Sequence, residues 1–489
     1  MTSFEEIRNE KVKKLQLLEE KGINPFPVSV ARDFEISEAL ARFSEFEKKK
    51  KKIRLVGRIK TVRGHGGSVF FDFFDGSGKM QGYIKKDEVG EESHALFSEA
   101  VDIGDFLEFT GVLFKTKRKE KTLKVTKWKM IAKSLRPLPD KWHGLQDIEE
   151  RYRKRYLDIL MNEEVKERFI LRSKIISETR DFLGKEGYLE VETPILQPLA
   201  GGAMAEPFKT HHNALDLDLY LRIAPELYLK KILIGGFERI YEMGRNFRNE
   251  GVDATHNPEF TMLELYAAYR DAAYLRGFTE KLLKFVTKRV LGKTQFVFGE
   301  HKISFAKKFK VVSYYDILKS YALIADPENS PREEVALKAK QFGIKVEDFE
   351  TKAKVLDNIY KKMCRPRLIQ PTFIIDYPVG ASPLAKRKDN NPNFIDRFQL
   401  VVGGIEIVNA FSELNNPIDQ RKRFAAQDKA KEAGEKDVSP SDEDYLEAME
   451  YGMPPAAGLG MGMDRLVMLL TNTNNIKEVI LFPTLRPKK

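Results

Sequence analysis

Residues 247–266 have the sequence FRNEGVDATHNPEFTMLELY, which predicts a polar turn followed by a β-strand. The preceding segment, residues 237–247, also alternates, so the two segments predict antiparallel strands joined by an arginine-bearing loop. Side chains alternate between the two faces of a strand. One face of the second strand therefore carries Phe260, Met262, Glu264 and Tyr266. A glutamate on a buried face needs a partner, which favours a binding site over a hairpin with surface ion pairs.

The turn holds Arg245, Arg248 and Glu250. An arginine there is suited to clamp a phosphate through two parallel hydrogen bonds. Phe260 is suited to stack on a base. The turn is therefore a candidate site for a phosphate-bearing ligand.

A second segment, GGIEIVNAFSEL at residues 403–414, predicts another strand. Strict alternation places Asn409 and Glu413 on one face and Glu406 on the other, unless Gly403–Gly404 forms a bulge. If this strand pairs with the strand of Glu264 and Tyr266, the shared pocket is acidic and suits a cationic group such as an ammonium.

Two further segments carry candidate ligand-binding residues. In GLGMGMDRLVMLL, residues 458–470, three glycines precede a helix with Arg465, and a buried arginine needs an anion. The spacing does not match a dinucleotide fingerprint, because position 463 is Met463. In APELYLK, residues 224–230, Glu226 lies in the first helical turn, where complementing the helix dipole is as good an explanation as ligand binding.

The rest of the sequence predicts how the chain is divided into domains. Residues 1–52 form a helical extension with a helix at 4–21, residues 53–133 a small barrel of five strands, and residues 134–160 a linker. The pattern fits a barrel of the OB type, which binds oligonucleotides. An SH3-like barrel would have much the same sequence pattern. Residues 161–489 form a second domain that begins with a long helix after Asn162. Strands dominate residues 188–269, and a mainly helical insertion occupies about 271–370.

Composition limits the function. The 84 Lys and Arg residues exceed the 73 Asp and Glu residues, and the net charge of +11 favours a polyanionic partner such as nucleic acid. Lys48–Lys52 is either a solvated loop or an RNA-facing patch. A single cysteine, Cys364, fits a reducing compartment. No secretory signal and no apolar run of membrane-spanning length is present, so we expect a cytoplasmic protein without a membrane partner. The adjacent His211 and His212 lack metal-ligand spacing and are expected to be structural or at the surface.

Together these segments resemble the class II aminoacyl-tRNA synthetases, and within them the bacterial-type lysine branch. The three class motifs occur in order: EGYLEVETPIL (186–196) with Pro194, FRNEG with HNPEFT (247–261), and GLGMGMDR (458–465) with Arg465. Segments typical of the lysine branch are LRPLPDKWHGLQD (135–147), HHNALDLDLYL (211–221), LYLRIAPELYLK (219–230) and AFSEL (410–414).

The resemblance implies an α+β protein, with an N-terminal OB-fold anticodon-binding barrel and a catalytic domain built on an antiparallel sheet flanked by helices. It implies that L-lysine is activated with ATP to lysyl-adenylate and pyrophosphate. Lysine is then transferred to the 3′-terminal adenosine of tRNA(Lys), with release of AMP. It also implies a homodimer and Mg²⁺ as cofactor.

The resemblance further implies roles for individual residues. The catalytic residues are Arg248, Arg465 and Glu406. ATP is bound by Arg248, Glu250, His256, Asn257, Phe260, Glu406 and Arg465, with Phe260 stacked on adenine. Lysine is surrounded by Gly202, Glu226, Arg248, Glu264, Tyr266, Asn409, Phe411 and Glu413. Of these, Glu413 and Tyr266 meet its side-chain ammonium, and Glu226 its α-amine. The anticodon is read by Phe70, Gln81 and Glu120.

One position departs from the family. Its metal-binding pair is two glutamates seven residues apart, and here Gln399 precedes Glu406. An amide oxygen still binds magnesium, more weakly, so we expect metal binding to be weakened or rearranged but not lost. Rival functions are an aspartate or asparagine enzyme, which needs a cationic pocket, and a lysine-modifying paralogue, which lacks the barrel. A non-catalytic RNA-binding relative is a third, and it should have lost Arg248, Glu406 or Arg465.

Overall fold

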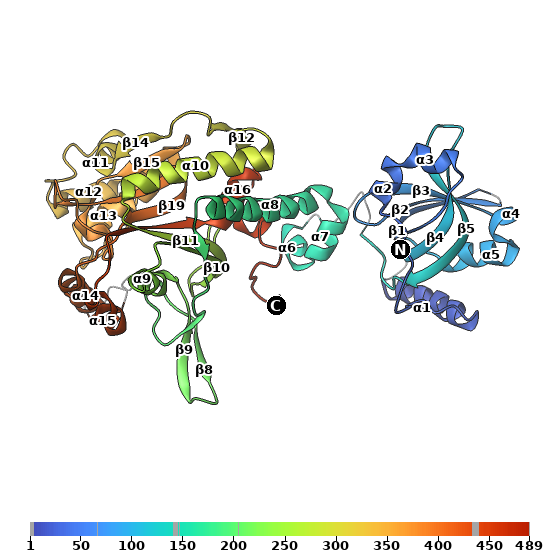
Figure 1. Cartoon of the computed structure of the whole chain (residues 1–489), viewed down its shortest axis with the longest axis horizontal. Helices are drawn as coiled ribbons and strands as arrows, with labels where there is room; N and C mark the ends of the chain where they lie inside the picture. The colour runs from blue at the N-terminus through green and yellow to red at the C-terminus, as the bar shows by residue number, and fades with distance from the viewer. Residues whose placement is uncertain are drawn as a thin grey trace. The chain divides into compact units, whose positions relative to one another are not determined.

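The computed structural model describes residues 4–65, 67–139, 145, 147–203, 205–432 and 440–488. The chain divides into two compact units, Met1–Gln146 and Asp147–Lys489, which are coloured from blue to cyan and from cyan to red in Figure 1. Residues 140–144 and 146 of the predicted linker lie outside the described residues. Within the described part of the chain, no helix is both long and apolar enough to cross a membrane.

The first unit contains a closed five-stranded barrel with the strand order β1-β2-β3-β5-β4. The strands are β1 (Lys52–His65), β2 (Ser68–Phe74), β3 (Lys79–Lys85), β4 (Phe106–Lys115) and β5 (Lys121–Ala132). β1 closes the barrel by pairing with β4, and β3 and β5 pair in parallel. This order is that of an OB-fold, which settles the choice between the two barrel types.

The barrel forms because its strands alternate apolar and polar residues. β2 turns Phe71 and Phe73 inward, where both rings pack against Phe109 of β4 at centroid distances of 4.7 and 4.9 Å. The helix predicted at 4–21 is confirmed as α1 (Phe4–Glu20). The other helices of this unit are α2 (Ile36–Ala41), α3 (Phe43–Lys48), α4 (Lys86–Val89) and α5 (Glu91–Ala100).

The second unit is built on an eight-stranded sheet with the order β14-β15-β18-β19-β20-β11-β10-β6. Its strands are β6 (Leu189–Glu190), β10 (Arg239–Phe247), β11 (Glu259–Ala268), β14 (Lys310–Ser313), β15 (Thr372–Ile375), β18 (Arg397–Val402), β19 (Ile405–Ser412) and β20 (Ala456–Gly462). The six strands from β15 to β10 pair antiparallel, and each edge strand pairs in parallel with its neighbour. The predicted antiparallel sheet flanked by helices is therefore confirmed.

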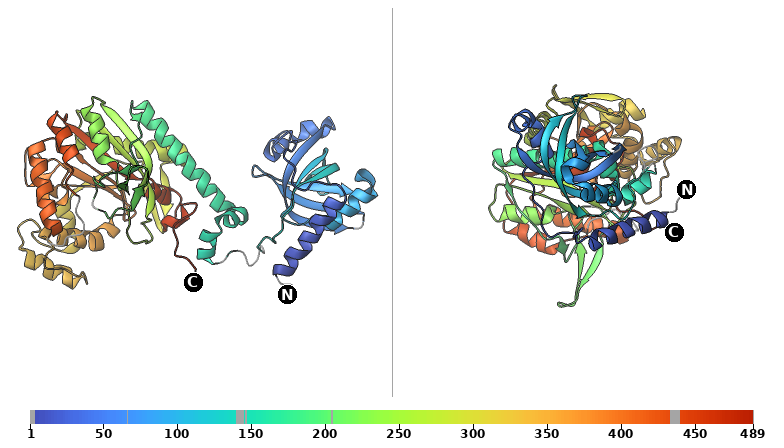
Figure 2. Two further views of the ribbon diagram at one scale, coloured as in Figure 1. Left: turned by 90° about the horizontal axis from the view of Figure 1, so that it is seen from below. Right: turned by 90° about the vertical axis from the view of Figure 1, so that its right-hand side faces the viewer.

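Three helices cover one face of this sheet. They are α8 (Glu163–Lys185), α10 (Ala272–Leu291) and α16 (Met463–Leu470), and they share an apolar core with the strands. α8 and α10 pack side by side along the sheet (Figures 1 and 2). The long helix predicted after Asn162 is confirmed as α8. The opposite face carries α9 (Glu226–Ile234) and the candidate site.

Smaller elements complete the unit. The short strands are β7 (Leu196–Gln197), β8 (Lys209–His212), β9 (Leu217–Leu221), β12 (Gln295–Phe298), β13 (His301–Ser304), β16 (Tyr377–Pro378) and β17 (Phe394–Ile395). The remaining α-helices are α6 (Ile148–Arg153), α7 (Arg155–Met161), α11 (Tyr314–Ile317), α12 (Arg332–Gln341), α13 (Lys352–Ile359), α14 (Pro417–Glu432) and α15 (Glu443–Glu450). Residues 271–370 contain both helices and strands, and their status as an insertion stays a prediction, as do the other domain boundaries.

The strand prediction for residues 188–196 is mostly wrong. Only the two-residue strands β6 and β7 touch this segment. Pro194 lies between them and has no N–H to donate to a neighbouring strand, which limits pairing there. His211 and His212 are confirmed as exposed residues, on the β8–β9 hairpin that projects from the unit (Figure 1).

Candidate active site

The predicted arginine-bearing loop is the connection between β10 and β11. These strands pair antiparallel from Arg239 opposite Ala267 to Phe247 opposite Glu259, as predicted. The loop closes where the N–H of Arg248 donates to the carbonyl of Pro258 at 2.8 Å. A tight hairpin base therefore fixes where the arginine side chain begins.

Asp253 organises the tip of the loop, and sequence reasoning missed it. Its carboxylate accepts hydrogen bonds from the backbone N–H groups of Thr255 and His256 and contacts His256 Nδ1 at 2.8 Å. Burial opposes ionisation of Asp253, but these hydrogen bonds lower its pKa to about 2. The signal was present in the sequence, because an aspartate that accepts from N–H groups two and three residues later is a common turn motif.

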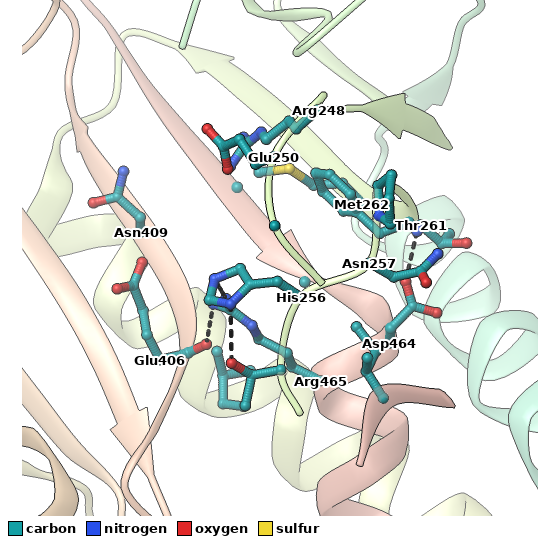
Figure 3. A pocket seen from close by; sticks show the side chains of 18 residues that line it. Arg248, Glu250, His256, Asn257, Thr261, Met262, Glu406, Asn409, Asp464 and Arg465 are labelled. Atoms are coloured by element: carbon teal, nitrogen blue, oxygen red, sulfur yellow. Dashed lines mark hydrogen bonds between the residues drawn. The ribbon is translucent and has the colours of Figure 1, made fainter. Parts of the chain in front are cut away.

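A pocket of about 220 Å³ opens beside this loop, between β11, β19, β20 and the start of α16 (Figure 3). Its lining includes all seven residues predicted to bind ATP, namely Arg248, Glu250, His256, Asn257, Phe260, Glu406 and Arg465. The structure therefore brings these residues together, although their role in binding ATP stays a prediction.

Arg248 is placed for an anion. Its guanidinium lies over the ring of Phe260, 5.1 Å from the ring centroid. Its Nε is buried and has no hydrogen-bond partner among the described residues. Burial lowers the pKa of Arg248, and the nearby Arg465 acts in the same direction, so a bound anion would relieve both effects.

Arg465 approaches the same pocket from α16. Its Nη1 donates to the carbonyl of Glu406 at 3.1 Å, and its Nη2 contacts His256 Nε2 at 2.9 Å (Figure 3). Burial lowers the pKa of Arg465, while the carboxylate of Glu406 opposes that shift. Two arginines and one histidine thus converge on one cavity.

The predicted placement of Glu406 is wrong. Val401 pairs with Glu406 and Leu400 pairs with Val408, so Ile407 is an extra residue that makes a bulge inside β19. The bulge turns Glu406 to the pocket side, where it lies on the same wall as Asn409 (Figure 3). The bulge forms at Ile407 and not at Gly403–Gly404.

Gln399 is buried, and its side-chain oxygen is already hydrogen-bonded. Its Oε1 accepts from the hydroxyl of Tyr377 at 2.7 Å and from that of Tyr360 at 3.5 Å. It is not among the residues that line the pocket. The described residues contain no cluster of three or more His, Cys, Asp or Glu side chains suited to a metal. Of the predicted metal-binding pair only Glu406 offers a carboxylate to the pocket, which fits an ion held mainly by a substrate's phosphates.

The predicted acidic pocket is present, but the predicted strand pairing is wrong. β11 and β19 do not pair with each other, because β20 lies between them. Tyr266 and Phe411 both face Gly458, and Glu264 and Asn409 both face Gly460. Side chains of the outer strands meet over the glycines of the middle strand.

At Gly458 and Gly460 there is no room for a larger side chain. A Cβ at Gly458 would lie 2.2 Å from Glu413 Oε1 and 2.4 Å from the ring of Tyr266. A Cβ at Gly460 would lie 2.4 Å from the terminal carbon of Met262. Alternate glycines therefore open the floor over which the acidic side chains lie.

Three carboxylates gather there: Glu226, Glu264 and Glu413 are all buried. Burial raises the pKa of Glu264 to about 8, although the hydroxyl of Tyr266 donates to it at 3.2 Å. Burial also raises the pKa of Glu413, and the neighbouring Lys230 opposes this shift. Gly202 adjoins the cluster, since a Cβ at this position would lie 3.0 Å from the Cβ of Glu226.

Sequence reasoning missed Lys230, which lies inside the cluster. Its Nζ is 2.6 Å from Glu226 Oε1 and 2.5 Å from Glu413 Oε2, and it lies 5.5 Å from the ring centroid of Phe411. The spacing of Glu226 and Lys230, four residues apart on one helix, is the signal that was available.

Comparison with known proteins agrees with this geometry. Residues 147–486 match a family described as tRNA synthetases class II (D, K and N). The chain belongs to this family. Residues 53–131 of this class II synthetase match the OB-fold nucleic acid binding domain, as the barrel topology requires.

Three similar curated proteins are named lysine–tRNA ligase. The protein from Carboxydothermus hydrogenoformans is 47% identical over 98% of this chain and 97% of its own length. That from Moorella thermoacetica is 46% identical over the same shares of both chains. That from Aquifex aeolicus is 48% identical over 89% of this chain and 73% of its own length.

In the barrel of the synthetase, the three predicted anticodon residues lie on β2, on β3 and immediately before β5. The ring of Phe70 lies 4.6 Å from that of Tyr83 between centroids. Gln81 Oε1 accepts from the hydroxyl of Thr122 at 2.9 Å, and the same hydroxyl contacts the carbonyl of Glu120 at 3.2 Å. Thr122 thus brings Gln81 and Glu120 together, and their contact with RNA stays a prediction.

Proposed function

We propose that this class II synthetase is a lysine–tRNA ligase. The observation that carries the proposal is a buried cluster of three carboxylates, Glu226, Glu264 and Glu413, beside a pocket with two convergent arginines. A cluster of this charge selects a substrate with ammonium groups, because a neutral side chain would leave buried carboxylates without a partner. The name shared by the similar proteins supports the same substrate.

ATP would occupy the pocket of Figure 3. Arg248 and Arg465 would hold its phosphates, and Phe260 would stack on adenine, with Glu250, His256 and Asn257 at the borders. The unpartnered Nε of Arg248 supports this assignment, since a buried arginine nitrogen needs an acceptor.

Lysine would bind next to it over the glycines of β20. Glu413 and Tyr266 would meet the side-chain ammonium, and Glu226 the α-ammonium. Arg248 would face the carboxylate. Gly202, Glu264, Asn409 and Phe411 would complete the pocket walls.

The reaction follows from this placement. A carboxylate oxygen of lysine attacks the α-phosphorus of ATP, a new phosphorus–oxygen bond forms, and pyrophosphate leaves. The terminal 3′-hydroxyl of tRNA then attacks the carbonyl carbon of the adenylate, and AMP leaves. Arg248 and Arg465 stabilise the negative charge that develops on the phosphate, and positioning replaces a side-chain nucleophile.

Magnesium bound to the phosphates of ATP would neutralise part of their charge, and Glu406 is the carboxylate that would hold it. Gln399 has a neutral amide whose oxygen already accepts from Tyr377, so it would bind the ion weakly. We also propose that Phe70, Gln81 and Glu120 read the anticodon of tRNA(Lys), that the protein is a homodimer and that it is cytoplasmic.

The test is ATP–pyrophosphate exchange with each of the twenty amino acids, without tRNA. We expect exchange with lysine alone. Exchange with aspartate or asparagine would contradict the acidic-pocket assignment. Absence of exchange with every amino acid would favour a non-catalytic RNA-binding relative.

A further inference from the structure

Lys230 is a charged side chain of the protein inside the amino-acid site. Its side chain is fully buried, and so is that of Glu413. Lys230 reaches Glu413 from α9 across to the end of β19, and it pairs with Glu226 one turn earlier on its own helix. It therefore ties together two carboxylates that come from different elements.

When all three carboxylates are ionised, the charges of this cluster do not balance without a ligand. Glu226, Glu264 and Glu413 carry three negative charges when ionised, and Lys230 supplies one positive charge. Two negative charges are then unmatched, and a lysine substrate brings two ammonium groups. Its carboxylate is directed to Arg248, outside this count.

Other groups face Lys230 from the elements packed around it. Tyr445 on α15 and Phe411 on β19 face Lys230 itself, and Tyr266 and Glu264 on β11 face its partners Glu226 and Glu413. Arg222 and Arg248 act on Glu264 and not directly on Lys230. Because the tyrosines stay neutral near pH 7, Lys230 is the cation that stabilises the ionised form of Glu413.

We propose that Lys230 is a positioning residue that sets the charge of the amino-acid site. Its ammonium opposes the effect of burial on Glu413 and orients the carboxylate, so that Glu413 meets an incoming substrate ammonium in its ionised form more readily than it would without Lys230. The inference rests on the proposed function, since it assigns the cluster to lysine.

The alternative is that Lys230 forms an ion pair that serves stability only. Experiment can distinguish this role from a role in binding lysine. Replacing a buried ion pair by apolar groups often leaves stability unchanged, so stability alone does not report a role in binding. A role in charge setting predicts that binding of lysine becomes pH-dependent when Lys230 is lost. Without its ammonium, Glu413 requires a higher pH to ionise.

The experiment compares Lys230→Met, Lys230→Gln and Lys230→Arg in lysine-dependent ATP–pyrophosphate exchange between pH 6.5 and 9. Lys231→Met is the matched control, because Lys231 is adjacent in sequence but pairs with the exposed Asp444. We expect Lys230→Met to raise the KM for lysine about 10- to 100-fold at pH 7, with the KM for ATP unchanged. The increase should shrink as pH rises, and Lys230→Arg should restore most of the affinity.

A native-like KM for lysine across this pH range in Lys230→Met would overturn the proposal. If that variant does not fold, as judged by its thermal transition, Lys230→Gln and Lys230→Arg decide. Equal KM values in these two variants at every pH would also overturn it. A native chain that exchanges with another amino acid would instead remove the proposed function, and this inference with it.

Discussion

The carboxylate of Asp464 accepts a hydrogen bond from the backbone N–H of Thr261 at 2.6 Å. The other oxygen of Asp464 lies 2.6 Å from Arg172 Nη1 on α8. One buried aspartate therefore joins the first turn of α16 to β11 and α8. Because Arg465 is the next residue, this contact also sets the position of the arginine in the pocket.

Loss of the Asp464 carboxylate should destabilise the second unit. Asp464→Ala leaves Arg172 without its buried partner, and we expect the free energy of unfolding to fall by about 3 kcal/mol. Urea titration measures it. Asp444→Ala removes a highly exposed partner of Lys231 and should change the value by less than about 1 kcal/mol. Equal effects of the two substitutions would contradict the assignment.

Removal of the Arg465 guanidinium should slow lysine activation. We expect Arg465→Ala to lower kcat of exchange by about 100- to 1000-fold, because charge on the phosphate loses a preorganised donor. The thermal midpoint should change little. Arg421→Ala is the control, since Arg421 forms ion pairs with the exposed Glu443 and Glu450. A kcat equal in the two variants would show that Arg465 does not act on the reacting phosphate.

Glu264 should make stability depend on pH. Its pKa is raised from 4.5 to about 8 by burial, so the folded protein holds a proton that the unfolded chain releases. This contribution to stability is complete below pH 4.5 and is lost progressively as pH rises to about 8. Urea titrations between pH 5 and 8 should show that Glu264→Gln loses less stability with rising pH than the native chain. The exposed Glu259→Gln should keep the native slope, and a native slope in Glu264→Gln would exclude this residue as the titrating group.

Gln399→Glu should tighten magnesium binding, so that exchange needs less magnesium. The added carboxylate lies two residues along β18 from Val401, the partner of Glu406. Two carboxylates bind magnesium more tightly than one, so the midpoint of a magnesium titration should fall several-fold. Tyr377→Phe, which removes a donor to the same oxygen, separates a hydrogen-bond effect from a charge effect. Identical titration curves for the native chain and Gln399→Glu would refute the metal assignment.

Phe70→Ala should weaken tRNA binding without affecting amino-acid activation. A stacked base contributes about 1–3 kcal/mol, which corresponds to a loss of about 5- to 150-fold in tRNA affinity. Exchange without tRNA should stay at the native rate. Ile103→Ala, another exposed position in the same unit, is the control. Native tRNA affinity in Phe70→Ala would place the RNA on another surface.

The parts of the site that lie within one continuous segment could be predicted from the sequence alone. Residues 239–268 form two strands and a turn, and period-two alternation correctly separated Leu263 and Leu265 in the core from Glu264 and Tyr266. The same held for the strands of the barrel, whose apolar residues alternate. These features depend on neighbours a few residues apart, which a pattern in the sequence records directly.

The strand order, the bulge in β19 and the contact between Lys230 and Glu413 became known only from the folded chain. β20 separates β11 from β19, and its glycines let Glu264, Tyr266 and Glu413 meet across a strand. The bulge at Ile407 turned Glu406 into the pocket, and Lys230 reached Glu413 from a helix more than 180 residues earlier in the chain. Strand order and register depend on how distant segments pack in the whole sheet. The periodicity of a single segment therefore does not predict them.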